Sequence, residues 1–306
     1  MPQSILITGG TGLVGTRLTE LLLANGHSVR YLSRNPKKTD KIEAYKWDIK
    51  SGYIDPKALE GVDTIVHLAG AGIADEKWTK ERKKVILQSR THSTQLLNKA
   101  LHENPHQVKA FVSASAIGYY GYDTGGVLKK EDSRFGDDFL ATVTKEWEFS
   151  VDSLATEHKD LRVAKLRIGI VLSEKGGALK ELVKPIKFGA GAPLGSGDQY
   201  MSWVHLDDLC GMFVFAVEND HISGTYNAVA PNPVTNKELT KIAAKALGKP
   251  LFLPNVPGFA LKLVLGEMAS MVLGGSKVSN EKIASAGYQY KFEEVKPAVH
   301  DLLKQP

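Results

Sequence analysis

Short apolar runs alternate with amphipathic stretches through the first two thirds of the chain. The runs are typical of buried strands and lie at residues 5–7, 28–32, 64–69, 110–113, 162–172 and 225–229. A further strand is expected to end at Asp48. Between the runs, apolar positions recur at helical spacing, and we expect helices over about 76–101 and about 138–154. Near-continuous apolar strands that alternate with helices indicate a parallel sheet covered on both faces.

The pattern loosens after residue 172. Residues 173–204 are rich in glycine, and the stretch that begins at Trp203 is expected to open a helix ending near Glu218. From residue 231 onward the chain is expected to be mainly helical, with Thr235 and Glu238 in the Thr-x-x-Glu pattern of a capping box. We therefore expect a sheet domain and a smaller, mainly helical domain, which faces it across a cleft and binds the substrate. Their respective ranges are 1–172 with 205–230, and 173–204 with 231–306.

One stretch of the smaller domain, residues 259–273, is strongly apolar. Core packing is the first expectation for such a run. A lid over an apolar substrate and a dimer face remain as alternatives.

A glycine-rich turn joins the first strand to the first helix. Gly9 permits a tight turn, Gly12 lets the backbone approach a pyrophosphate, and Gly15 lets the helix pack closely on the strand. The first helical turn adds free N–H groups and the positive end of the helix dipole. This arrangement predicts a doubly wound Rossmann fold that binds a dinucleotide. The contacts expected at this turn come from Gly9, Thr11, Gly12, Leu13, Val14 and Gly15.

The end of the second strand indicates which dinucleotide is bound. An acidic residue at that place binds the ribose 2′-hydroxyl of NAD, whereas an arginine accommodates the 2′-phosphate of NADP. Here the strand ends in Ser33 and Arg34, and a planar guanidinium suits a phosphate. NADP(H) is therefore the expected cofactor. Asp48 could accept a hydrogen bond from the adenine amino group, or it could serve only as a turn aspartate.

Composition narrows the function classes. With 306 residues, 42% hydrophobic and 24% charged, the chain has the make-up of a globular protein. The single cysteine, Cys210, excludes an internal disulfide and is expected to be buried, and no metal site is expected. The net charge is +5, but the lysines are spread among acidic residues, so we expect no nucleic-acid partner. The sequence shows no signal peptide and no membrane span, and we expect a cytoplasmic protein.

Three motifs together resemble the extended short-chain dehydrogenase/reductase superfamily, the group that contains nucleotide-sugar epimerases and dehydratases. They are the turn at 8–15, the run at 67–72 and the run Ser-Ala-Ser-Ala-Ile-Gly-Tyr-Tyr-Gly at 113–121. Trp147-Glu148 and the run at 202–205 are similar to an atypical branch labelled as SulA-type cell division inhibitor homologues. The resemblance covers essentially the whole chain. It implies that Leu68, Ala69, Gly70 and Ser113 also contact the cofactor.

The resemblance also implies a catalytic trio of serine, tyrosine and a lysine four residues after the tyrosine. Ser115 matches the serine and Lys145 the lysine, but the tyrosine position holds Ala141. Tyr119 and Tyr120 follow Ser115 on the loop that leaves the strand, where ligands bind in such sheets. Either could replace the missing proton donor, or both could be packed aromatic residues at the pocket.

Further residues are expected near the pocket. Arg167 could hold the cofactor or a substrate anion, or it could form a buried pair with Glu148. Gln199, Trp203 and His205 follow the glycine-rich stretch, where a substrate-closing loop would suit. His205 with Asp207 is expected to be a pair that stabilises the fold.

Three function classes follow. The first is an NADP(H)-dependent oxidoreductase or epimerase acting on a small carbonyl or hydroxyl compound, and a homodimer is possible. The second, which the absent tyrosine favours, is a non-catalytic NADPH-binding redox sensor or an interaction protein of cell division. The third, a purely structural protein, is disfavoured by the intact glycine turn.

Overall fold

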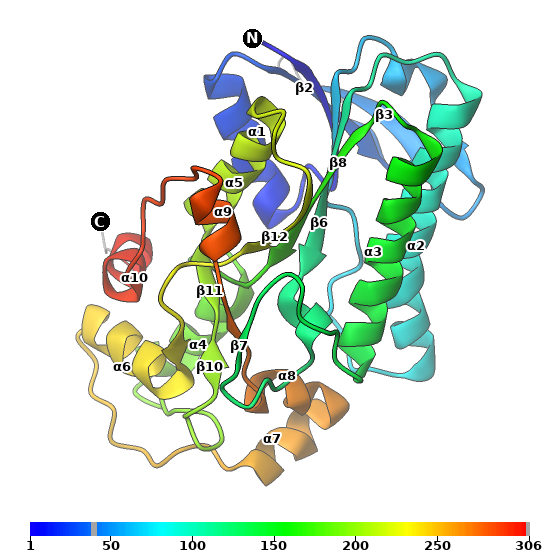
Figure 1. Cartoon of the computed structure of the whole chain (residues 1–306). Helices are drawn as coiled ribbons and strands as arrows, with labels where there is room; N and C mark the ends of the chain where they lie inside the picture. The colour runs from blue at the N-terminus through cyan, green and yellow to red at the C-terminus, as the bar shows by residue number, and fades with distance from the viewer. Residues whose placement is uncertain (38–41, 304–306) are drawn as a thin grey trace.

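A large, mainly parallel sheet forms the centre of the computed structural model, which describes residues 1–37 and 42–303. Its strand order is β12-β8-β6-β5-β1-β2-β3-β4, and only β4 runs antiparallel to its neighbour (Figure 1). The order doubles back at β1, which is the signature of a doubly wound sheet. The expected α/β Rossmann fold is thereby confirmed. The strands are β1 (Ser4–Thr8), β2 (Ser28–Ser33), β3 (Glu43–Asp48), β4 (Tyr53–Ile54), β5 (Thr64–His67), β6 (Ala110–Ala116), β8 (Arg162–Ile168) and β12 (Gly224–Ala228).

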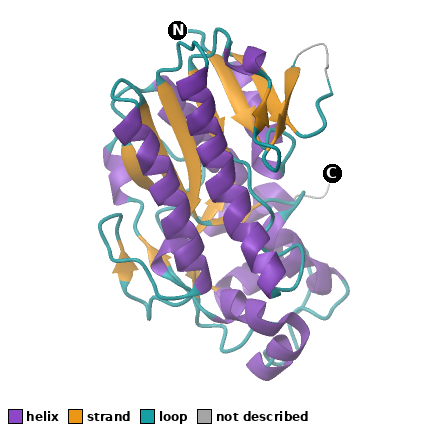
Figure 2. Cartoon of the chain, turned by 90° about the vertical axis from the view of Figure 1, so that its right-hand side faces the viewer, coloured by secondary structure: helices purple, strands orange, loops and turns teal. Residues whose placement is uncertain are grey.

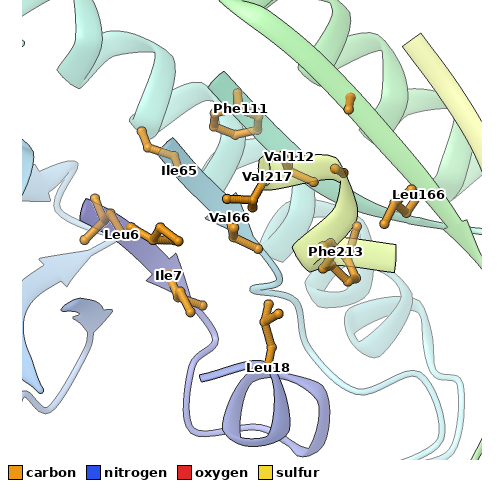
Figure 3. Close-up of a cluster of buried hydrophobic side chains, with 14 of the residues drawn as sticks. Leu6, Ile7, Leu18, Ile65, Val66, Phe111, Val112, Leu166, Phe213 and Val217 are labelled. Carbon is orange, nitrogen blue, oxygen red and sulfur yellow. The ribbon is translucent and has the colours of Figure 1, made fainter. Parts of the chain in front are cut away.

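Helices cover both faces of this sheet. α1 (Leu13–Ala24) and α5 (Leu206–Glu218) pack on one face, and the long α2 (Lys80–Glu103) and α3 (Phe139–Glu157) lie side by side on the other (Figure 2). The core between strands and helices is apolar and fully buried, as Ile7, Leu18 and Phe213 illustrate (Figure 3). Cys210 belongs to this core, as expected. α2 begins four residues later than predicted, because Thr79 caps it by accepting a hydrogen bond from the Arg82 N–H.

The predicted strand 162–172 is wrong as a single element. It splits at Gly169 into β8 and β9 (Ile170–Leu172), and β9 pairs with β11 (Trp203–His205) in a separate two-stranded sheet. A Cβ atom at Gly169 would lie 2.4 Å from the carbonyl oxygen of Ser202. The glycine therefore lets the two backbones cross closely, and the chain leaves the large sheet at this point.

A second hydrophobic core lies beyond that crossing. It joins α4 (Gly177–Lys187), α6 (Asn236–Ala246) and α10 (Val295–Leu303), with Trp203 fully buried among them. α4 lies inside the glycine-rich stretch, where no helix was expected, and it buries Leu179, Val183 and Ile186 at helical spacing. The capping box of Thr235 and Glu238 at the start of α6 is confirmed. The division into two domains stays a prediction, which the separate core supports.

Core packing of the apolar stretch 259–273 is wrong for its first half. All residues of α7 (Gly258–Leu265) are half-buried or exposed, with Phe259 77% and Leu263 83% exposed. The reason is its position in the fold, since the main contacts of α7 with other elements are with the short η3 (Gly266–Met268) and α8 (Ala269–Leu273) at the end of the smaller domain (Figure 1).

The remaining elements are short. They are β7 (Leu128–Lys129), β10 (Tyr200–Met201), β13 (Val234–Thr235), β14 (Lys277–Val278), α9 (Glu281–Ser285) and the 3-10 turns η1 (Pro56–Leu59) and η2 (Ile117–Tyr120). Within residues 1–37 and 42–303, every helix is too short or too polar to cross a membrane.

Candidate functional site

The turn between β1 and α1 has the geometry of a phosphate cradle. Gly9 has a φ of 72°, and its carbonyl oxygen accepts a hydrogen bond from the Gly12 N–H at 3.0 Å. A Cβ atom at Gly15 would lie 2.3 Å from that same carbonyl oxygen, so only glycine lets the helix start so close to the turn. Gly9 and Gly15 thus act as the sequence predicted.

The N-terminus of α1 is open to solvent. Gly12 is the N-cap and is exposed, as is Thr11, while Leu13 and Val14 are half-buried. The first helical turn carries no acidic side chain within this described segment. The free N–H groups and the positive dipole end of α1 therefore suit a phosphate. A pyrophosphate fits this cradle.

The loop after β5 lies directly against that turn. The N–H groups of Leu68 and Ala69 both donate to the Thr8 hydroxyl at 3.1 Å. A Cβ atom at Gly9 would lie 3.1 Å from the Ala69 nitrogen, which shows how closely the two loops pack. Gly70 is exposed at the edge of the cradle. The structure thus brings together two predicted cofactor segments that lie far apart in the sequence.

A buried histidine holds this loop in place. The Thr8 hydroxyl lies 2.7 Å from Nδ1 of His67, and Nε2 of His67 lies 3.1 Å from the Ser93 hydroxyl of α2. Because Thr8 already accepts two N–H groups, its own proton goes to Nδ1, and Nε2–H donates to Ser93. Burial, followed by the positive charge of Arg90, lowers the pKa of His67 to about 3, so this histidine is neutral.

Ser33 and Arg34 lie at the end of β2, beside the cradle. Arg34 is exposed, and the Ser33 hydroxyl accepts a hydrogen bond from the Asn35 N–H at 3.2 Å. Asp48 ends β3, and its carboxylate accepts the Lys50 N–H at 2.9 Å, which lowers the pKa of Asp48. Asp48 is therefore a turn aspartate, and a contact with adenine stays a prediction.

Arg167 is held by Glu148, the second of the two alternatives for this residue. Its Nε donates to Oε1 of Glu148 at 2.7 Å and its Nη2 to Oε2 at 2.8 Å, and both side chains are buried. Burial opposes the charged form, but the hydrogen bonds and charge of Glu148 prevail and raise the pKa of Arg167. Such a two-point pair fixes both side chains at the carboxyl ends of β6 and β8.

Ser115 joins the same pair. Its hydroxyl donates to Oε1 of Glu148 at 2.5 Å, and the side chain is buried. The serine proton is thus directed at the carboxylate, which leaves the oxygen lone pairs to accept a hydrogen bond. Ser113 is fully buried, and its hydroxyl donates to the Ala114 carbonyl oxygen at 2.8 Å.

The two neighbouring tyrosines have different environments. The Tyr120 hydroxyl donates to Oδ1 of Asn227 at 2.7 Å and accepts from Arg167 at 2.9 Å, and burial raises its pKa to about 12. Tyr119 is half-buried, and its ring stacks 3.5 Å from the Arg167 guanidinium. Within the described residues the Tyr119 hydroxyl has no hydrogen-bond partner, so it is free to meet a ligand.

Ala141, at the position of the family tyrosine, is fully buried in α3. Lys145 is exposed one turn further along, with its ammonium 4.6 Å from the Phe135 ring centre. The same ring packs edge-on against Tyr119 at 6.1 Å. Phe135 therefore connects the environments of Lys145 and Tyr119.

The loop residues expected to close over a substrate have structural partners. Gln199 Nε2 donates to the carbonyl oxygens of Leu194 and Val272, and Trp203 Nε1 donates to that of Asn232. The expected pair of His205 and Asp207 is a helix cap, in which the His205 Nδ1 accepts the Asp207 N–H at 3.1 Å. The Asp207 carboxylate binds Arg17 of α1 at 2.7 Å instead.

The sequence interpretation missed two residues of the site. Asn227 on β12 holds the Tyr120 hydroxyl, and Arg90 on α2 lies buried beneath the loop after β5. The run Thr-Tyr-Asn-Ala-Val, in which Asn227 is the central residue, gives no local sign of a contact with Tyr120. Arg90 stands on the helix face that also carries the buried Ser93 and Thr94, and this polar stripe on an otherwise apolar face could have drawn attention.

Comparison with known proteins shows which family the chain resembles. The family described as "NAD dependent epimerase/dehydratase family" matches residues 5–228, and "Domain of unknown function (DUF1731)" matches residues 256–302. The Arabidopsis thaliana "Epimerase family protein SDR39U1 homolog, chloroplastic" is 37% identical over 309 residues, which cover 99% of this chain and 87% of the relative. The Bacillus subtilis "Epimerase family protein YfhF" is 34% identical, with 98% of each chain covered.

A solved structure supports the same family assignment. The crystal structure of human epimerase family protein SDR39U1 (isoform2) with NADPH superposes with a TM-score of 0.88 at 35% identity, and 98% of this chain and 99% of that chain are covered. The expected resemblance to the extended dehydrogenases is confirmed, and the human relative holds the cofactor type expected here. This chain belongs to the NAD dependent epimerase/dehydratase family.

Proposed function

We propose that this chain is an NADP(H)-dependent oxidoreductase or epimerase-like enzyme acting on a small carbonyl or hydroxyl compound. The NADPH in the human relative and the phosphate cradle at the β1–α1 turn support the cofactor. The pyrophosphate would lie over Gly9, Gly12 and Gly15, with Leu68, Ala69 and Gly70 beside it. Arg34 would bind the 2′-phosphate through its exposed guanidinium.

The free hydroxyl of Tyr119 is the observation that carries the catalytic proposal. Tyr120 is committed to Asn227 and Arg167, so of the two adjacent tyrosines only Tyr119 offers a hydroxyl to a substrate. A bound nicotinamide supplies or accepts a hydride. Tyr119 would then move the proton at the reacting oxygen of the substrate, in place of the tyrosine absent at Ala141.

Ser115 and Lys145 would have supporting roles. The Ser115 proton is directed at Glu148, so its oxygen would accept a hydrogen bond from a substrate hydroxyl and orient it. Lys145, which is exposed, would hold the cofactor ribose through its ammonium group. Arg167 would act as a positioning residue, because its charge is used by Glu148 and its flat face by Tyr119.

The wall on the substrate side would be aromatic. Trp78 packs 5.0 Å from Phe139 and 6.2 Å from Tyr122, and the ammonium of Lys83 lies 4.9 Å from the Phe139 ring centre. Lys83 also binds Glu267 of η3 at 2.5 Å, which connects α2 to the smaller domain. Residues 173–204 and 231–306 would form the substrate-binding domain. A homodimer and a cytoplasmic location stay predictions.

A second candidate is a non-catalytic NADPH-binding protein. The buried Ala141 and the committed Ser115 proton favour it, since the usual proton donor is missing and the usual hydrogen-bond donor is engaged. The two candidates differ in whether the nicotinamide changes its redox state.

The test uses the two tyrosines as a matched pair. The pure protein is loaded with NADPH or NADP⁺ and mixed with a small-molecule extract, and the nicotinamide absorbance is followed. We expect a protein-dependent change that Tyr119→Phe loses and Tyr120→Phe largely keeps, with NADPH affinity unchanged in both variants. An internal epimerisation returns the hydride, so it is followed by chiral separation of the substrate pool. Undiminished turnover in Tyr119→Phe would refute its role, and bound NADPH without any conversion would favour the second candidate.

A further inference from the structure

Arg90 differs from the other deeply buried arginine of the site. It projects from α2, is 9% exposed, and donates through Nη1 to the carbonyl oxygens of Ala71 at 3.1 Å and Ile86 at 3.0 Å. Its guanidinium also lies 5.2 Å from the Trp147 ring centre. Arg167 has a carboxylate on two of its nitrogens, whereas Arg90 has no ion pair anywhere in residues 1–37 and 42–303.

As far as the structure describes the chain, this arrangement leaves the buried positive charge of Arg90 without a counter-charge. Burial lowers the pKa of Arg90 to about 10, and the positive charge of Arg82 adds to the effect. The group stays charged near neutral pH, so the protein bears the cost of desolvating it. Two carbonyl dipoles and one aromatic face offset that cost only in part.

The position of Arg90 indicates where a counter-charge would come from. A Cβ atom at Gly70 would lie 3.1 Å from Cζ of Arg90, so the guanidinium packs directly beneath the loop after β5. That loop lies against the β1–α1 turn through Thr8 and Gly9. The turn is the phosphate cradle of the site. The loop after β5 thus packs against Arg90 through Gly70 and against the cradle through Leu68 and Ala69, and charges in a protein interior interact more strongly than in water.

We propose that Arg90 is a positioning residue whose counter-charge is supplied by the phosphates of the bound dinucleotide. The charge of Arg90 thus couples cofactor binding to the stability of the loop after β5. This inference rests on the proposed NADP(H) binding. It implies that Arg90 has opposite effects in the two states, since its charge costs stability in the free protein and favours binding of NADPH.

The test compares Arg90→Met, Arg90→Lys and a control, Lys84→Met, which removes an exposed charge from the same helix. Thermal unfolding without cofactor and the NADPH dissociation constant by calorimetry are measured for each. We expect Arg90→Met to unfold at or above the wild-type temperature without NADPH, yet to bind NADPH about tenfold more weakly. Arg90→Lys keeps the charge and should retain most of the affinity, and Lys84→Met should match the wild type.

Two outcomes would overturn the inference. One is wild-type NADPH affinity in Arg90→Met. The other is a loss of stability or of folding in Arg90→Met without cofactor, which would make Arg90 a structural residue of the loop. The proposed cofactor itself fails separately, when the wild-type protein does not bind NADPH.

Discussion

Two regions at the carboxyl edge of the sheet differ in whether their charged side chains are paired within the protein. Around β6 and β8, the side chains of Ser115, Glu148 and Arg167 satisfy one another within the protein. Around β1 and β2, Arg34 is exposed, Arg90 is buried without an acidic partner in the described chain, and the α1 N-terminus is open. The first, the closed region, has its side-chain geometry fixed by contacts within the protein. The second, the open region, is complementary to an anion, which must come from outside the protein.

This difference suggests that cofactor binding and the proposed catalysis depend on different regions of the site. The open region accounts for dinucleotide binding. The description of the family, which names NAD, points to the same property. Among the described residues, the closed region leaves the Tyr119 hydroxyl without a hydrogen-bond partner beside the Arg167 pair, so the proposed catalysis would depend on that one side chain. A protein could keep the first property and lose the second, and the two regions can be tested independently.

The largest effect on stability is expected from Glu148→Ala, which removes the acidic partner of Arg167 in the closed region. Arg167 would remain buried without its partner, and such a loss costs about 3–5 kcal/mol of unfolding free energy. Urea unfolding measures it, with Glu146→Ala on the same helix as the control. A loss below about 1 kcal/mol, the range of an exposed ion pair, would contradict the closed character of this region.

A smaller effect is expected from Arg34→Ala, which removes an exposed positive charge from the open region. Charge-assisted hydrogen bonds to a phosphate contribute about 1.5–3 kcal/mol, so NADPH should bind about tenfold to a hundredfold more weakly. NADH, which lacks the 2′-phosphate, should be nearly unaffected, and Lys46→Ala at an exposed position of β3 should change neither. Equal weakening of both cofactors would mean that Arg34 does not read the 2′-phosphate.

The smallest effect near neutral pH concerns His67, which holds the loop between the two regions. Burial is the main reason that the pKa of His67 in the folded protein is about 3, well below the ordinary histidine value of 6.5. The unfolded chain therefore binds more protons between these values, and stability should fall as pH decreases through that window. The slope of unfolding free energy against pH should be shallower in His67→Gln than in the wild type. An unchanged slope would show that His67 contributes nothing to it.

Local patterns predicted the parts of the fold and site that depend on neighbours in sequence. The turn at Gly9, the end of β3 at Asp48 and the capping box at Thr235 are all formed by adjacent residues. The bend at Gly169 was not predictable, because it depends on the approach of Ser202, which lies just before β11 and far away in the sequence. The exposure of α7 likewise follows from its place at the end of the domain rather than from its apolar composition.

The site shows the same limit at the level of single side chains. Tyr119 and Tyr120 are adjacent and identical in type, so only the contacts of Tyr120 with Asn227 and Arg167 distinguish them. The partner of Arg167 was among the alternatives because Glu148 stood nearby in a recognisable motif. That Arg90 lacks an acidic partner among the described residues is a property of the folded chain, and no sequence pattern indicates it.

The most direct test is a calorimetric titration of the wild-type protein with NADPH and, in parallel, with NADH. We expect one saturable site per chain for NADPH, with NADH bound at least about tenfold more weakly because it lacks the phosphate that Arg34 would meet. Equal affinity for the two, or no binding of either, would contradict the assignment of the open region as an NADP(H) site.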